Sequence, residues 1–266
     1  MSDAILFAVE EGMARLTLNR PARLNAFNAD LAHAWKDATA EATSRADVKA
    51  ILIDAAGPAF CAGGDVIDMA TTMGASGADI TALAEVINAG IRSLTESAVP
   101  VVAAAHGTTA GGGLGILLSS DYAVVGSRSK LGSLYANIGL TPDLSVSAQL
   151  ARAVGQRRAL QLVLQDRLLS AAEAVEWGLV AEAVEGADAA AEAESVRARG
   201  EEIARFWLAG AAEAYGQAKR LVRSQPERTF VEQLSEEARS IGAALETADA
   251  QARVAAFAAA SAKKAG

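Results

Sequence analysis

The chain has 266 residues, of which 52% are hydrophobic, and its formal net charge is -8. This length and apolar content exclude a disordered chain and suit one large domain or two modest ones with a well-filled core. The acidic balance argues against nucleic acids and anionic membranes as partners, because both are bound through basic patches, and no apolar run reaches the roughly 18 residues that cross a bilayer.

The N-terminal half is predicted to alternate short strands with helices. Two apolar runs flank the turn Glu11-Gly12 and are expected to form a hairpin, which Pro21 ends because proline cannot donate to a sheet. A helix with Trp35 on its apolar face follows, and the polar stretch 71–77 is expected to be a mobile loop. The predicted ranges are strands at 5–9, 13–19 and 48–54 and helices at 28–44 and 79–97.

The second half begins in the same way and ends in helices. Strands at 122–125 and 130–134 are predicted to pair with each other around Gly126-Ser127. Ser170 and Glu173 form a capping box, in which the two side chains satisfy free amides at the start of a helix. The other predicted elements are a strand at 101–105, a helix from about Gly112, helices at 145–154 and 156–164 separated by Gly155, a helix that ends near Gly178 and a strand at 179–184.

From residue 187 onward the pattern is almost entirely helical and is interrupted by Pro226. This change predicts an α/β core at residues 1–200 and a helical region at residues 201–266. The alanine-rich faces of the helical region suit close helix packing or subunit contact.

Glycines follow two of the predicted strands. Gly111, Gly112, Gly113 and Gly115 follow the strand at 101–105, in a spacing that fits neither the dinucleotide fingerprint nor the phosphate loop. Glycine lets backbone amides approach a ligand, and the start of a helix leaves amides unpaired, although close helix–strand packing also explains such a run. A second strand at 51–54 leads into paired glycines at 63 and 64. Two such turns can supply the two amide donors of an oxyanion hole.

Five segments then resemble the crotonase superfamily, the enoyl-CoA hydratase/isomerase family, over nearly the whole chain. They are LNRPARLNAF (18–27), FCAGGD (60–65), AGGGLG (110–115), IGLTPD (138–143) and DAQARVAAF (249–257). The resemblance implies an α/β fold with a spiral of ββα units and a C-terminal helical region that forms trimers or dimers of trimers. It also implies a CoA thioester substrate, no metal or further cofactor, and a thioester oxygen held by the amides of Ala62 and Gly112.

The resemblance further implies substrate contacts along these segments. The residues concerned are Arg23, Ala26, Cys61, Gly63, Gly64, Asp65, Val66, Gly111 and Gly139. The helix at 79–97 would line the acyl pocket, with Glu85 and Asn88 as candidates for polar contacts.

The chain departs from the hydratase pattern at two positions. Typical hydratases of the family carry glutamates where this chain has Gly115 and Tyr135. A tyrosine, with a reference pKa of about 10, is a poor base at neutral pH. Water addition by a glutamate pair is therefore not expected, and Tyr135 is expected to orient the acyl group or to form a hydrogen bond to an intermediate.

Asp143 is the remaining candidate for a catalytic carboxylate, because some family members carry one at this position. We expect it to move a proton between carbons of the acyl chain. Four alternatives stay open. Asp143 attacks the acyl carbon in a hydrolase- or dehalogenase-like reaction, or it caps the helix at 145–154. The protein could also bind acyl-CoA without catalysis, or be a hydratase that uses unusual groups.

Cys61 is the only cysteine, so no intrachain disulfide can form and a reducing cytoplasm is the expected setting. No basic region precedes a hydrophobic stretch at the N-terminus, so no secretory signal is expected. Nothing in the sequence places His33 or His106 beside Cys61 to activate it, so we interpret Cys61 as a packing residue.

Overall fold

The computed structural model describes residues 3–71, 76–165 and 167–265. Its larger sheet has the strand order β1-β2-β3-β4-β6-β9, with β1 antiparallel to β2 and the other neighbours parallel. A smaller sheet has the order β5-β7-β8. The strands are β1 (Ile5–Glu10), β2 (Met13–Leu18), β3 (Ala50–Ala55), β4 (Val101–Ala105), β5 (Thr108–Ala110), β6 (Tyr122–Gly126), β7 (Lys130–Gly132), β8 (Leu168–Ser170) and β9 (Glu182–Val184).

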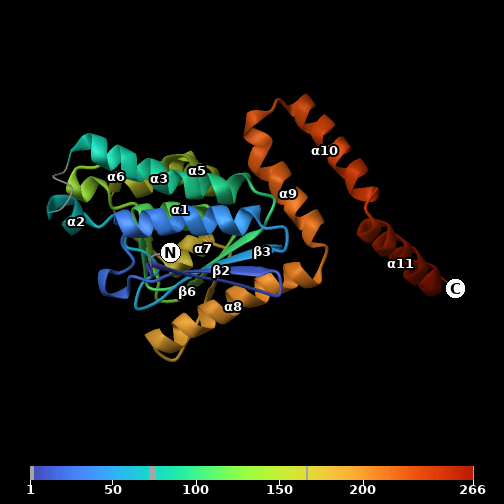
Figure 1. The fold of residues 1–266 in the computed structure, drawn as a ribbon, viewed down its shortest axis with the longest axis horizontal. Coiled ribbons are helices and arrows are strands. Elements are labelled where there is room, and N and C mark those ends of the chain that lie inside the picture. Colours follow the sequence, from blue (N-terminus) through green and yellow to red (C-terminus); the bar gives the residue numbers. More distant parts are fainter. Residues whose placement is uncertain (1–2, 72–75, 166, 266) are drawn as a thin grey trace.

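Helices cover both faces of the larger sheet, with α1 and α3 on one side and α8 on the other (Figure 1). Strands β3 and β4 are buried along their whole length, as expected for parallel strands between helical layers. The helices are α1 (Ala29–Ser44), α2 (Val66–Thr71), α3 (Gly77–Glu96), α4 (Gly112–Leu118), α5 (Val146–Val154), α6 (Gln156–Gln165), α7 (Ala171–Glu176), α8 (Ala189–Ala209), α9 (Ala212–Ser224), α10 (Phe230–Leu245) and α11 (Ala248–Ala265).

Trp35 explains why α1 and α3 pack closely. Its indole is fully buried, lies edge-on to Phe27 with 6.3 Å between ring centroids, and donates a hydrogen bond to the Ile87 carbonyl. A Cβ on Gly90 would come within 2.2 Å of the Trp35 ring nitrogen, so only glycine lets α3 approach this side chain. The apolar contact fixes the position of α3 above the sheet.

Most predicted elements are confirmed, including the N-terminal hairpin, the α1 helix and the Ser170–Glu173 capping box. One prediction is wrong: β6 and β7 do not pair. Strand β6 lies between β4 and β9 in the larger sheet, whereas β7 lies between β5 and β8 in the smaller one. The intervening turn is held by Glu192 of α8, which is buried and accepts hydrogen bonds from Ser127 and Arg128. The predicted loop at 71–77 lies mostly outside the described residues.

Of the helices beyond β9, the first packs on the sheet and the later ones lie away from it. Helix α8 packs on the sheet and contains residue 200, where Gly200 lets it approach Leu52 and Ala104. Helix α9 follows at the edge of the body and contacts α3 and α8, whereas α10 leads away from the body and α11 forms the far end (Figure 1). In the described part of the chain, no helix is both long and apolar enough to cross a bilayer.

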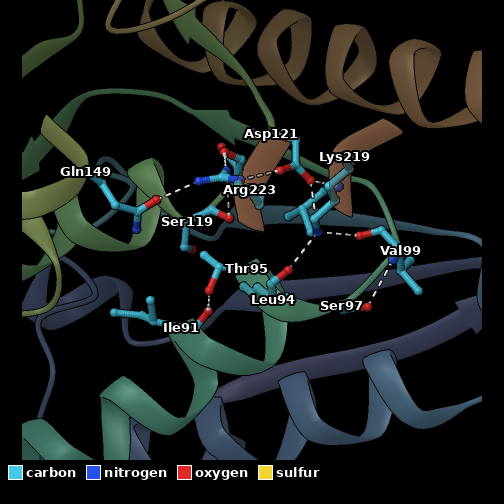
Figure 2. Close-up of polar contacts among 12 residues, drawn as sticks. Ile91, Leu94, Thr95, Ser97, Val99, Ser119, Asp121, Gln149, Lys219 and Arg223 are labelled. Carbon is cyan, nitrogen blue, oxygen red and sulfur yellow. Dashed lines mark hydrogen bonds and ion pairs between the residues drawn. The ribbon is translucent and has the colours of Figure 1, made fainter. Parts of the chain in front are cut away.

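A buried ion-pair cluster anchors α9 to the core (Figure 2). Lys219 is 7% exposed and donates to the carbonyls of Leu94 and Val99 at 2.7 and 2.6 Å. Its ammonium also lies 3.0 Å from the carboxylate of Asp121, which Arg223 contacts at the same distance from its other side. These contacts join α9 to the end of α3 and to the start of β6.

Candidate active site

The two glycine turns meet in the structure. Cys61 and Thr109 form a parallel bridge, and the Ala110 amide donates to the Cys61 carbonyl at 3.0 Å. Gly63 and Gly111 have φ angles of +106° and +52°, conformations that favour glycine. A Cβ on Gly63 would lie 3.3 Å from the Gly112 nitrogen, so backbone from both turns lies side by side as predicted.

The amide donors differ from the prediction. The Ala62 amide donates to the Leu24 carbonyl at 3.0 Å, so it is not free to bind a thioester oxygen. Among the residues described, the amides of Gly64 and Gly112 have no protein acceptor. The assignment of Ala62 as a donor is therefore wrong, whereas Gly112 keeps the free amide that the prediction requires.

The segment at residues 20–27 explains why the Ala62 amide already has a hydrogen-bond acceptor. Asn25 is fully buried and bonds the carbonyls of Ala56 and Ala59, and its side-chain oxygen accepts from the Arg20 amide. This brings the Leu24 carbonyl against the second glycine turn.

A pocket of about 510 Å³ opens beside the free amides. One wall comes from α3, whose residues Ile80, Leu83, Ala84 and Ile87 share one helix face. Facing groups come from α2 and from the segment at 134–144, which includes Leu134, Leu140 and Leu144. The pocket is thus an apolar cavity with a few polar groups, the usual form of a small-molecule site.

Asp143 and Tyr135 provide a polar pair in this pocket. The Tyr135 hydroxyl donates to the Asp143 carboxylate at 2.5 Å, and both residues line the cavity. Asp143 keeps contact with solvent, but burial of its carboxylate at the pocket wall raises its pKa, while the hydrogen bond from Tyr135 lowers it in part. Burial, followed by the nearby charge of Asp143, raises the pKa of Tyr135, so the phenol stays protonated and acts as a donor.

The structure does not support capping as the role of the Asp143 side chain. The residue that caps α5 is Ser145, and no side-chain capping bond is formed there. The Asp143 carboxylate instead binds Tyr135. Its environment is that of a titratable group in a cavity, which is typical of a functional carboxylate.

The predicted residues divide into two groups. Those that line the pocket are Asp143, Tyr135, Ala62, Gly63, Gly64, Val66, Gly111 and Gly112. Arg23, Ala26, Cys61, Asp65 and Gly139 lie outside its lining. Asp65 is 4% exposed and pairs with Arg20 and Arg23, and the hydrogen bond from Arg23 chiefly lowers its pKa.

The cysteine and the two histidines lie in environments that suit packing or solvent exposure rather than catalysis. Cys61 is fully buried, and burial raises the pKa of its thiol to about 12. His106 is buried and its ring contacts the Gly57 carbonyl at 2.7 Å, whereas His33 is exposed on α1. Among residues 3–71, 76–165 and 167–265, no cluster of His, Cys, Asp and Glu could hold a metal ion.

The sequence prediction named α3 as a pocket wall, which is confirmed, and one of its two polar candidates lies in that wall. Glu85 does line the pocket, but it is exposed and lies 3.8 Å from Arg92, and Asn88 does not line it. The apolar residues at positions 80, 83, 84 and 87 form the wall, and their helical spacing was the available signal.

Known proteins are similar to this chain over most of its length. The sequence model of the enoyl-CoA hydratase/isomerase family matches residues 8–263. A 1,2-epoxyphenylacetyl-CoA isomerase from Escherichia coli (strain K12) is 34% identical over 70% of this chain and 71% of its own length. A protein described as a "probable enoyl-CoA hydratase" from Rhodobacter capsulatus is 32% identical over 95% of this chain and 94% of its own length.

Solved structures agree with the sequence comparison. An enoyl-CoA hydratase/isomerase from Cupriavidus metallidurans CH34 superposes with a TM-score of 0.86 at 26% identity, covering 97% of this chain and 94% of that one. The fold is therefore that of the crotonase superfamily, as predicted. The chain belongs to the enoyl-CoA hydratase/isomerase family.

Proposed function

We propose that the protein is an acyl-CoA isomerase in which Asp143 transfers a proton between two carbons of the acyl group. The observation that carries this proposal is the Asp143–Tyr135 pair in an apolar pocket beside two free backbone amides. Gly115 stands where a hydratase of the family has a glutamate, so the second carboxylate of that mechanism is missing.

The proposed reaction begins with the thioester oxygen between the amides of Gly64 and Gly112. In a 3-enoyl thioester, the Asp143 carboxylate removes a proton from C2, and the negative charge moves to the thioester oxygen, where the two amides stabilise it. The protonated Asp143 then returns one proton to C4, so that the double bond lies between C2 and C3. Burial raises the pKa of Asp143, and a raised pKa suits this transfer because it makes the carboxylate a stronger base. The same chemistry can assist the rearrangement of an oxygen heterocycle next to the thioester.

The pocket supports an apolar acyl group as substrate. Its α3 wall contains only aliphatic side chains, apart from Thr81 and the exposed Glu85. A carboxylate at the far end of the acyl chain would lose its hydration here without gaining a cationic partner from the residues that line the pocket.

The direct test uses 3-enoyl-CoA thioesters of increasing chain length and measures formation of the conjugated 2-enoyl product. We expect turnover with apolar acyl groups and at least tenfold lower kcat/KM for an analogue with a terminal carboxylate. Binding without turnover over the whole panel would favour the non-catalytic alternative. Release of free CoA or halide, with no movement of the double bond, would favour hydrolase or dehalogenase chemistry.

The hydrogen bond from Tyr135 to Asp143 should affect how kcat/KM depends on pH. Tyr135→Phe removes the donor that stabilises the Asp143 carboxylate, so the pKa of Asp143 should rise further above its usual range. Since the base works only when ionised, the acidic limb of the kcat/KM profile should move to higher pH. Tyr122→Phe is the control, because that hydroxyl bonds Glu182 outside this pocket and should leave the limb in place. An unmoved limb in Tyr135→Phe would show that Asp143 is not the titrating base.

We also propose that the protein forms homotrimers or dimers of trimers through its C-terminal helices. Large apolar side chains are exposed there, at Val222, Phe230, Val231, Leu234, Ile241, Leu245, Val254 and Phe257. Such an apolar surface is typical of a subunit interface. Sedimentation velocity should give a mass of three or six 27.2 kDa chains, and a single monomeric species would contradict the proposal.

A further inference from the structure

Gly115 lies inside α4 and is buried, although glycine weakens a helix interior relative to alanine. A Cβ at this position would meet the backbone carbonyl oxygen of Leu144 at 2.2 Å and its carbonyl carbon at 3.1 Å. The obstacle is main chain and cannot turn aside as a flexible side chain could. Glycine is therefore needed here so that the segment before α5 can lie directly against α4.

Leu144 is held in this position by several features. It is 5% exposed and has a φ angle of +47°, and Ser145 follows with +67°. Two consecutive non-glycine residues with positive φ are uncommon and persist only where the surroundings determine them. The Leu144 side chain also covers the glycine turn, since a Cβ on Gly112 would come within 2.7 Å of its terminal carbon.

The position of Leu144 determines that of its neighbour Asp143. The Val146 amide donates to the Asp143 carbonyl at 2.9 Å and closes the turn that contains Leu144. The Asp143 side chain leaves this turn toward Tyr135. A shift of the Leu144 carbonyl must therefore move the backbone from which the Asp143 carboxylate extends.

We infer that Gly115 is a positioning residue, which seats Leu144 against α4 and so holds the Asp143 carboxylate against Tyr135. The inference rests on the proposed function only for its catalytic consequence. It also explains why no larger residue fits at 115: a glutamate there would occupy the space taken by the Leu144 backbone. Hydratases of the family have a glutamate at position 115, whereas in this chain Gly115 positions the carboxylate of Asp143.

The test compares Gly115→Ala with Gly242→Ala. Gly242 also lies within a helix, but a Cβ there would meet nothing within 4 Å. Relief of the Gly115→Ala contact requires a shift of about 1 Å in the Leu144 backbone, and misplacement of this size can cost roughly 100-fold in rate. We expect kcat to fall about 100-fold in Gly115→Ala, with KM changed less than threefold, and both constants to stay unchanged in Gly242→Ala.

A second readout does not depend on turnover. The pKa of Asp143 can be measured by carbon NMR, with Asp143→Asn to assign the signal. In the otherwise unchanged protein, Tyr135→Phe should raise this pKa, whereas in the Gly115→Ala background the same substitution should leave it unchanged, because the two groups have separated. A folded Gly115→Ala protein that retains the Tyr135 effect would overturn the inference.

Two further comparisons cover the cases in which Gly115→Ala does not fold or the protein has no isomerase activity. If circular dichroism shows that Gly115→Ala does not fold, Leu144→Ala is the second variant. It removes the side chain that packs over Gly112 and so loosens the seat of residue 144 from its other side, and loss of the Tyr135 effect is expected there too. Retention of the effect in folded Leu144→Ala would then overturn the inference. If the unmodified protein isomerises no thioester, the proposed function fails, but the NMR comparison still decides whether Gly115 positions Asp143.

Discussion

Asp143→Asn is expected to lower kcat for double-bond migration by about 10³-fold, within the range that general acid–base catalysis contributes. Asparagine keeps the size of the side chain and an oxygen that can accept from Tyr135, so the pocket geometry should persist. The lost property is the ability to take up and release a proton. Substrate affinity should therefore change less than threefold, which equilibrium binding of a non-reactive acyl-CoA can measure.

Glu85→Gln provides the matched comparison, because Glu85 is another carboxylate that lines the pocket. It is exposed and lies near Arg92, so its neutralisation should change kcat by less than threefold. A large loss in Glu85→Gln together with full activity in Asp143→Asn would transfer the role of base to Glu85. Full activity in both variants would show that neither carboxylate takes part in catalysis.

Isotope incorporation separates proton transfer from nucleophilic attack by the same residue. A covalent acyl-aspartate intermediate would be released by water, and oxygen-18 from the solvent would enter the Asp143 side chain. Proton transfer leaves both carboxylate oxygens in place. Because Asp143 keeps contact with solvent, the proton that it carries from C2 to C4 exchanges with deuterium oxide in part of the turnovers, and deuterium enters the acyl group. We expect deuterium in the product and no oxygen-18 in the peptide that contains Asp143.

The general architecture could be predicted because local patterns determine it. The apolar runs at β3 and β4 and the capping box of α7 act over a few residues, and the structure has each of them. The pairing of β6 with β7 was wrong for the same reason. A short polar turn between two strands suggests a hairpin, but contacts with β9 and with Glu192 of α8, far along the chain, send the two strands to different sheets.

The sequence predicted which segments form the candidate site, but not which of their backbone amides are free to bind a substrate. Both glycine turns, Tyr135 and Asp143 do meet in one pocket. Which amide of a turn remains free depends on partners elsewhere, and the Leu24 carbonyl that occupies the Ala62 amide lies 38 positions earlier in the chain. The contact between Gly115 and the Leu144 backbone likewise depends on two left-handed residues that no side-chain pattern reveals.

Lys219→Met is expected to lower the free energy of unfolding by about 3 kcal/mol, the lower end of the cost of breaking a buried ion pair. Burial lowers the pKa of Lys219, although the charge of Asp121 partly opposes this effect, and the ammonium makes up for its lost hydration through three close contacts. Methionine fills a similar volume but leaves the carbonyls of Leu94 and Val99 without this donor. Asp121 keeps its contact with Arg223, so the loss should stay below that of leaving a carboxylate with no partner.

Urea unfolding followed by circular dichroism measures this loss, with Lys36→Met as the control because Lys36 is exposed on α1. The position of Lys219 predicts where the damage appears. Since it joins α9 to the end of α3 and to the start of β6, amide hydrogen exchange should quicken first in α9 while β3 and β4 stay protected. The apolar residues of α10 and α11 follow α9 in the chain, so a loosened α9 should also weaken the subunit association that we propose for these helices. Equal stability of Lys219→Met and Lys36→Met, with unchanged exchange in α9, would show that apolar packing alone holds this helix to the core.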